Sequence, residues 1–188
     1  MKLIRRILPA LLLMWGCTEA PHPPSFTIRH PDMNYLEFLS RAEALVKEKF
    51  PEWYVAGVKK ELIFVNSNND EFATITGQED GNLVMSIYGL AWDLCAVEDL
   101  ASVLLHEYVH VKIWDELDEK IPNKWCNIAV HELTAYGVQM RQRRIRVKGA
   151  MRRSPRLGYD LAYLQAKAFC PQKTIKDFPK PGVHLYVR

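Results

Sequence analysis

The sequence predicts an α+β domain in which a small antiparallel or mixed sheet precedes two long antiparallel helices. Three observations support this class. Short β-prone segments separated by turn residues occupy residues 61–88, an apolar run without Pro or Gly extends from about Ala96 to Leu117, and a helical pattern follows from Lys124 to about Val147. Strands repeat their side-chain pattern every two residues and helices every 3.6, so the change of pattern marks a sheet followed by helices.

The first 16 residues have the pattern of an export signal. Three cations among the first six residues precede the apolar stretch Ile7–Trp15, which is too short to span a bilayer. Gly16 and Cys17 come next, and this arrangement resembles a bacterial lipoprotein signal with Cys17 lipidated. Because Thr18 rather than Asp follows, the resemblance implies the periplasmic face of the outer membrane. We therefore expect an exported protein of the bacterial cell envelope, attached to the membrane through its N-terminal lipid. An ordinary cleaved signal or an uncleaved anchor is the alternative.

The remaining chain divides into a tether and one domain. Residues 17–33 contain four prolines and are typical of an extended tether, and residues 34–188 are long enough for a domain with its own core. Removing residues 1–16 takes away three of the 25 Lys and Arg and none of the 22 Asp and Glu, so the mature chain has no net charge. A nucleic-acid partner fits poorly with an exported protein. The sequence does not specify the oligomeric state, and we expect a monomer.

The domain should begin with an amphipathic helix and continue into strands. The helix is expected over Tyr35–Phe50, and its inward stripe is Leu36, Leu39, Ala42, Leu45, Val46 and Phe50. Three strands are expected at Leu62–Val65, Phe72–Thr76 and Leu83–Tyr88. The turn Asn66–Asp70 lacks the Gly and the distal Glu of an EF-hand loop, which favours a polar turn over a calcium site.

The motif His106-Glu107-Tyr108-Val109-His110 lies inside the long apolar run. On a helix, two histidines four residues apart share one face and can bind one zinc ion. Glu107 points about 100° round the helix from His106, where it can reach a water at the metal. Because the surrounding residues are apolar on every face, the two histidines and the glutamate should be buried, and buried polar groups need partners. A chance match to the motif is the alternative.

A third ligand is expected from the next helix. Glu132 falls in the middle of its apolar stripe, which is Trp125, Ile128, Ala129, Leu133, Tyr136 and Met140. A carboxylate on a core face must be paired or must bind a metal. The short connection Asp118–Asn123 favours an antiparallel return, and at about 1.5 Å per residue this return brings Glu132 to the height of His110. A buried salt bridge to Arg or Lys is the alternative.

Together these residues resemble the gluzincin metallopeptidases, in which H-E-x-x-H is followed some twenty residues later by E-x-x-A, here Glu132–Ala135. The resemblance covers about forty residues. It implies a zincin-like fold, zinc held by His106, His110 and Glu132, and Glu107 as general base. The thermolysin-like pattern places a supporting Asp four residues after the ligand Glu, but this chain has Tyr136 there. The chain is more similar to compact gluzincins, and the partner that orients the first histidine is not evident.

The resemblance implies a zinc-dependent peptidase that hydrolyses a peptide or protein substrate. The oxyanion of the reaction needs a donor besides zinc, and His131 and Tyr136 are candidates, each with a structural role as the alternative. In the zincin layout an edge strand holds the substrate by main-chain pairing, and Leu83–Tyr88 is the best candidate for it. An ordinary small sheet that covers the helix is an equal alternative. The alternative function is a non-catalytic envelope lipoprotein that keeps the fold for binding or structure.

The last part of the chain carries a helix, cysteines and a basic segment. The helix is expected over Leu157–Phe169, ended by Pro171, with Leu157, Leu161, Leu164 and Ala168 inward. Besides Cys17 the chain contains Cys95, Cys126 and Cys170, which permit one disulfide and one free thiol whose pairing the sequence leaves open. Arg141–Arg156 holds eight cations and no acids, which favours a solvated helix end over contact with an anionic partner.

Overall fold

The computed structural model describes residues 35–63, 72–77, 83–88, 91, 94, 96–118, 123–141, 145–147, 153–176 and 178. The helices in this part of the chain are α2 (Tyr35–Lys49), α3 (Val97–Asp118), α4 (Lys124–Arg141), α5 (Ser154–Phe169) and the short α6 (Gln172–Ile175). The strands are β1 (Lys59–Ile63), β2 (Ala73–Gly77) and β3 (Leu83–Tyr88). The α+β class and the order of strands before long helices are confirmed. No described helix is long and apolar enough to cross a membrane.

The predictions for the export signal, Cys17, the tether, the Asn66–Asp70 turn and Cys95 lie outside the described residues.

The described strands form a mixed three-stranded sheet in the order β1-β3-β2. β1 is parallel to β3, and β2 is antiparallel to it. The prediction of Leu83–Tyr88 as an edge strand is therefore wrong, because β3 is paired on both sides. Its four consecutive buried residues, Val84–Ile87, are those of a central strand covered on both faces. β2 takes an edge position and packs next to α3.

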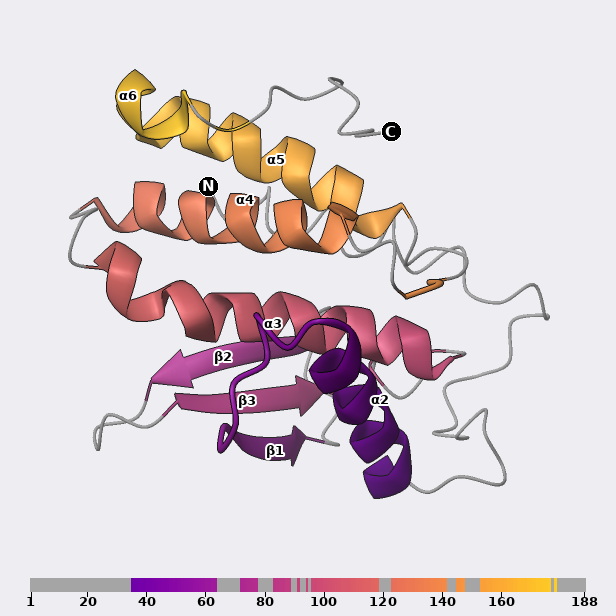
Figure 1. Ribbon diagram of the computed structural model, residues 1–188. Helices are drawn as coiled ribbons and strands as arrows, with labels where there is room; N and C mark the ends of the chain where they lie inside the picture. The colour runs from indigo at the N-terminus through magenta and orange to yellow at the C-terminus, as the bar shows by residue number, and fades with distance from the viewer. Residues whose placement is uncertain are drawn as a thin grey trace.

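α3 is the central helix of the fold. Figure 1 shows it between the sheet and α4, with α5 beyond α4. Every residue from Asp99 to His110 is buried, as the apolar run on all faces predicts. Glu98 and Asp99 begin the helix, where acidic side chains interact favourably with the helix dipole. α2 packs against another side of α3, so the HExxH segment is enclosed by neighbouring elements.

Several predicted inward faces are wrong. Leu36 in α2 is 68% exposed, and Trp125 at the start of α4 is 46% exposed. In α5, Leu157 and Leu164 are 51% and 59% exposed, and Ala168 is exposed as well. The face of α5 that packs on α4 consists mostly of small residues: Pro155, Gly158, Tyr159, Ala162 and Ala166. Small side chains allow two helices to approach closely, so the larger leucines point outward.

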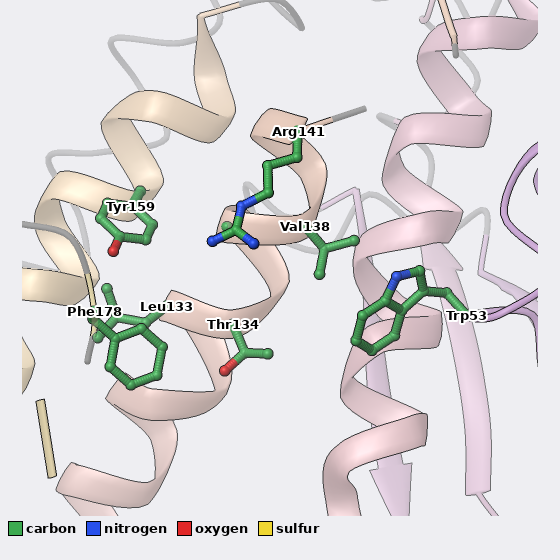
Figure 2. Close-up of a pocket in the computed structure, with 8 residues that line it drawn as sticks. Trp53, Leu133, Thr134, Val138, Arg141, Tyr159 and Phe178 are labelled. Atoms are coloured by element: carbon green, nitrogen blue, oxygen red, sulfur yellow. The ribbon is translucent and has the colours of Figure 1, made fainter. Parts of the chain in front are cut away.

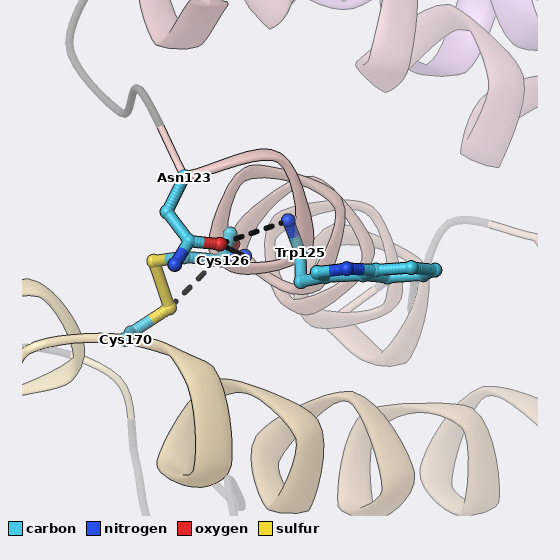
Figure 3. The surroundings of a disulfide bond; sticks show 4 residues. All are labelled: Asn123, Trp125, Cys126 and Cys170. Atoms are coloured by element: carbon cyan, nitrogen blue, oxygen red, sulfur yellow. Dashed lines mark hydrogen bonds between the residues drawn. A yellow bond between two sulfur atoms is a disulfide. The ribbon is translucent and has the colours of Figure 1, made fainter. Parts of the chain in front are cut away.

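α4 has a defined start and ends earlier than predicted. Asn123 caps its first turn, because Oδ1 accepts hydrogen bonds from the backbone N–H groups of Trp125 and Cys126 at 3.0 and 3.1 Å (Figure 3). The helix ends at Arg141, and residues 145–147 are not helical, so the predicted extension to Val147 is wrong. The described cations Arg141, Arg146, Arg153 and Arg156 of the basic segment are all exposed, which agrees with a solvated surface.

A disulfide joins Cys126 near the start of α4 to Cys170 at the end of α5 (Figure 3). This pairing, which the sequence left open, ties the outer helix to the helix that carries Glu132.

Candidate metal centre

The structure brings the three predicted ligands together. His106 and His110 lie one turn apart on α3, and Glu132 lies opposite them on the antiparallel α4. The two histidine Nε2 atoms are 3.0 Å apart. Oε2 of Glu132 lies 3.4 Å from Nε2 of His106, and Oε1 lies 3.5 Å from Nε2 of His110. One ligand atom from each residue thus falls within 4.8 Å of the others, and the group could hold a metal ion.

These separations fit a zinc ion. Zinc binds imidazole nitrogen and carboxylate oxygen at about 2.0–2.2 Å, which places two ligands of one tetrahedral centre roughly 3.3 Å apart. The observed separations of 3.0, 3.4 and 3.5 Å bracket this value. Two imidazoles and one carboxylate form a donor set that suits zinc, and three protein ligands leave the fourth position for water or substrate.

The charges of the group also suit metal binding. Burial alone would raise the pKa of Glu132, but the hydrogen bond from His106 and the nearby histidine charges lower it to about 2. Burial and the neighbouring His106 lower the pKa of His110 to about 3. Burial would also lower the pKa of His106, but hydrogen bonding to Glu132 and the negative charges of Glu132 and Glu107 raise it. At neutral pH Glu132 is therefore ionised and His110 neutral, which are the states that bind metals.

Glu107 lies beside this group without being one of the three ligands. Its side chain is buried on α3, and its charge contributes to raising the pKa of His106. Glu107 is thus a buried carboxylate close to the three possible ligands.

The two candidate oxyanion donors each contact one histidine. The ring of His131 is buried and stacks on His110, with centroids 5.7 Å apart and an interplanar angle of 18°. The ring of Tyr136 lies 4.4 Å from that of His106. On its other side Tyr136 lies directly over Gly158 of α5, where a Cβ would overlap the ring. Tyr136 thus packs between His106 and Gly158.

The sequence interpretation missed Gln139 and Ser102. Gln139 is 4% exposed and lies seven residues after Glu132, on the same face of α4. Its Nε2 donates to the backbone oxygen of Ser102 at 3.0 Å and to Ser102 Oγ at 2.9 Å. Ser102 is also buried, one turn before His106. A polar residue two turns after a predicted ligand was the signal that could have identified Gln139.

A separate cavity of about 320 Å³ lies on another side of α4. Its lining comes from Trp53, Leu133, Thr134, Gly137, Val138, Arg141, Tyr159 and Phe178. Figure 2 shows the guanidinium of Arg141 pointing into it between Tyr159 and Val138. At about 100° per residue, Thr134 and Val138 face away from Glu132, so this cavity is distinct from the three-ligand group.

Comparison of the chain with protein-family models, curated proteins and solved structures found no match. The interpretation of the site therefore depends on its own geometry and chemistry.

Proposed function

We propose that this protein is a zinc-dependent peptidase that resembles the gluzincins, with zinc held by His106, His110 and Glu132. The observation that carries the proposal is the convergence of these three side chains from two antiparallel helices, at separations that fit one zinc ion. Zinc bound by these residues would supply a Lewis acid for the scissile carbonyl and would make water a nucleophile at neutral pH.

Glu107 acts as the general base in this proposal. It takes the proton from the attacking water and later gives it to the leaving amine. Its place directly after His106 on α3 and its buried side chain support the role, because the carboxylate lies close to the proposed ligands and is shielded from bulk water. His131 and Tyr136 remain the proposed donors to the oxyanion, and each lies against one of the two histidines.

The proposed peptide path runs along β2. This strand is at an edge of the described sheet and packs next to α3, whereas β3 has no free edge. An extended peptide can add to an exposed strand edge through main-chain hydrogen bonds. Because these bonds do not involve side chains, peptides of many sequences can bind in this way. This arrangement would bring the substrate backbone near the helix that carries Glu107.

We also propose that the protein works in the bacterial envelope, anchored through a lipid on Cys17. The disulfide between Cys126 and Cys170 supports export, because disulfides persist in oxidising compartments and are rare in the cytosol. Mass spectrometry of the protein from membranes tests this directly. A mature chain that begins with a lipid-modified Cys17 is expected, and an unprocessed chain would contradict it.

The substitution Glu107→Gln tests the peptidase. It keeps the size of the side chain but removes the proton acceptor, so zinc should stay bound while hydrolysis of an unfolded protein falls by about 10²–10⁴. The matched control is Glu98→Gln, the same substitution at the start of the same helix, which should retain activity. Chelation should abolish activity in the wild type, and added zinc should restore it.

Two results would contradict this account. If Glu107→Gln hydrolyses the substrate as fast as Glu98→Gln, Glu107 is not the base. If zinc-loaded wild type hydrolyses no peptide or unfolded protein, the protein is not a peptidase, and the non-catalytic alternative is favoured.

A further inference from the structure

The orientation of His106 needs a second contact. Its Nε2 faces Oε2 of Glu132 at 3.4 Å and Nε2 of His110 at 3.0 Å. A metal ligand of this kind must present a lone pair at Nε2, so the ring proton must sit on Nδ1. Nδ1 is buried, and no described residue forms a well-aligned hydrogen bond with it. The atom that accepts a hydrogen bond from Nδ1–H therefore decides which tautomer the ring adopts.

Gln139 has the complementary atom. The backbone oxygen of Ser102 can only accept a hydrogen bond, so the amide group that faces it at 3.0 Å must be the NH₂ of Gln139. Oε1 of Gln139 must then point away from this contact. Like Nδ1 of His106, Oε1 is buried and forms no well-aligned hydrogen bond with a described residue.

The two atoms belong to side chains that meet the same face of α3, one helical turn apart. Ser102 holds the Gln139 amide one helical turn before His106, on the same face of α3. Since Nε2 of His106 faces Glu132 and His110, Nδ1 is the ring nitrogen left for Gln139.

We propose that Gln139 is the positioning residue for His106: its Oε1 accepts the Nδ1–H and holds the ring with Nε2 directed at the metal. Ser102 fixes the amide by accepting both of its donated hydrogen bonds. Gln139 and Ser102 thereby supply the support that the sequence pattern lacks at Tyr136, while Tyr136 packs on the face of the same ring. This inference depends on the proposed zinc site for its functional consequence.

The test compares Gln139→Met with Thr134→Val in the full-length protein. Gln139→Met keeps a similar length but removes the acceptor. Thr134→Val is the matched control, because it removes a hydroxyl that bonds within α4 to the Val130 oxygen at 2.9 Å and faces away from the site. Zinc affinity is measured by competition with a chelator. Loss of a residue that orients a metal ligand costs about 10–100-fold in affinity, so Gln139→Met should lose that much and Thr134→Val should bind as the wild type does.

A second readout follows the bond itself. ¹H–¹⁵N spectra of the histidine rings report the Nδ1–H of His106 in the metal-free and zinc-loaded protein. A slowly exchanging Nδ1–H in the wild type that disappears in Gln139→Met supports the proposal. Equal zinc affinity and an unchanged Nδ1–H signal in Gln139→Met would overturn it.

The two readouts separate this inference from the proposed function. If the wild type binds no zinc, the zinc site is refuted, and the Nδ1–H signal of the same sample still decides whether Gln139 accepts from His106. If Gln139→Met does not fold, the wild-type signal alone decides: slow exchange of the Nδ1–H with water supports the bond, and a ring protonated on Nε2 alone overturns it.

Discussion

Replacing Gly158 with Ala should destabilise the protein, although alanine is the better helix former. A Cβ at Gly158 would meet three carbons of the Tyr136 ring, with Cε2 at 2.6 Å and Cζ closest. Ordinary contact begins near 3.4 Å, so the ring would have to retreat by at least about 0.8 Å. The ring of His106 lies 4.4 Å away from that of Tyr136, which limits the retreat.

Two opposing effects set the magnitude. Forcing an extra carbon into a packed site costs about 1–3 kcal/mol, and the large overlap places this site in the upper part of that range. Replacing a helical glycine with alanine contributes about 1 kcal/mol in the other direction. The net expected loss in the free energy of unfolding is about 1–2 kcal/mol, or a few degrees in Tm for a chain of this length.

Gly137→Ala provides the matched control. Gly137 is also helical and buried, but a Cβ there would lie 3.7 Å from Cε2 of Tyr159, which is ordinary contact. Only the gain in helix propensity remains, so this variant should be more stable than the wild type by up to about 1 kcal/mol. Urea unfolding of the three proteins measures both changes. A stabilised Gly158→Ala, or changes of the same sign in both variants, would refute the close approach of Tyr136 to α5.

Three further predictions concern stability and pH. The Cys126–Cys170 bridge joins residues separated by 44 positions in the sequence. In the chain-entropy account, its reduction should lower the free energy of unfolding by about 4 kcal/mol. Urea unfolding with and without reductant measures this change, and a loss below about 1 kcal/mol would contradict the prediction. Burial alone would raise the pKa of Glu43, but hydrogen bonds, that from Lys60 first, lower it. A folded-state pKa below the unfolded value adds stability above the ordinary pKa, and this stability is lost as the pH falls through the lowered pKa. The stability advantage of wild type over Glu43→Gln should therefore shrink from about pH 6 to about pH 3, and a constant difference would count against these hydrogen bonds. Because the pKa of His106 is raised, a proton competes with the metal there, so zinc affinity should still increase with pH above the ordinary histidine value of about 6.5; an affinity that is flat from there to about pH 8 would argue against this competition.

The parts of the site that depend on local spacing could be predicted from the sequence. His106 and His110 share a helix face because of their separation, and the apolar residues around them predict a buried helix. Glu132 could be placed because a short connection between two helices restricts the register of an antiparallel pair. These inferences need only the geometry of a helix.

Other features depend on tertiary packing and could not be predicted in the same way. β3 is central because β1 pairs directly with it in parallel, although β2 lies between these two strands in the sequence. No local sequence pattern specifies that strand order. The sequence pattern predicts the leucines on the inward face of α5, but the residues buried against α4 include Gly158, Ala162 and Ala166. The role inferred for Gln139 requires knowing that α4 faces Ser102.

The most direct test of the central claim is the zinc content per chain of purified wild type beside Glu132→Ala. The proposed three-ligand site predicts one zinc ion per wild-type chain and a large loss in the variant, because the variant keeps only the two histidines. No zinc in freshly prepared wild type would contradict the zinc centre. Equal zinc in both proteins would leave the two histidines as ligands but remove Glu132, and with it the resemblance to the gluzincins.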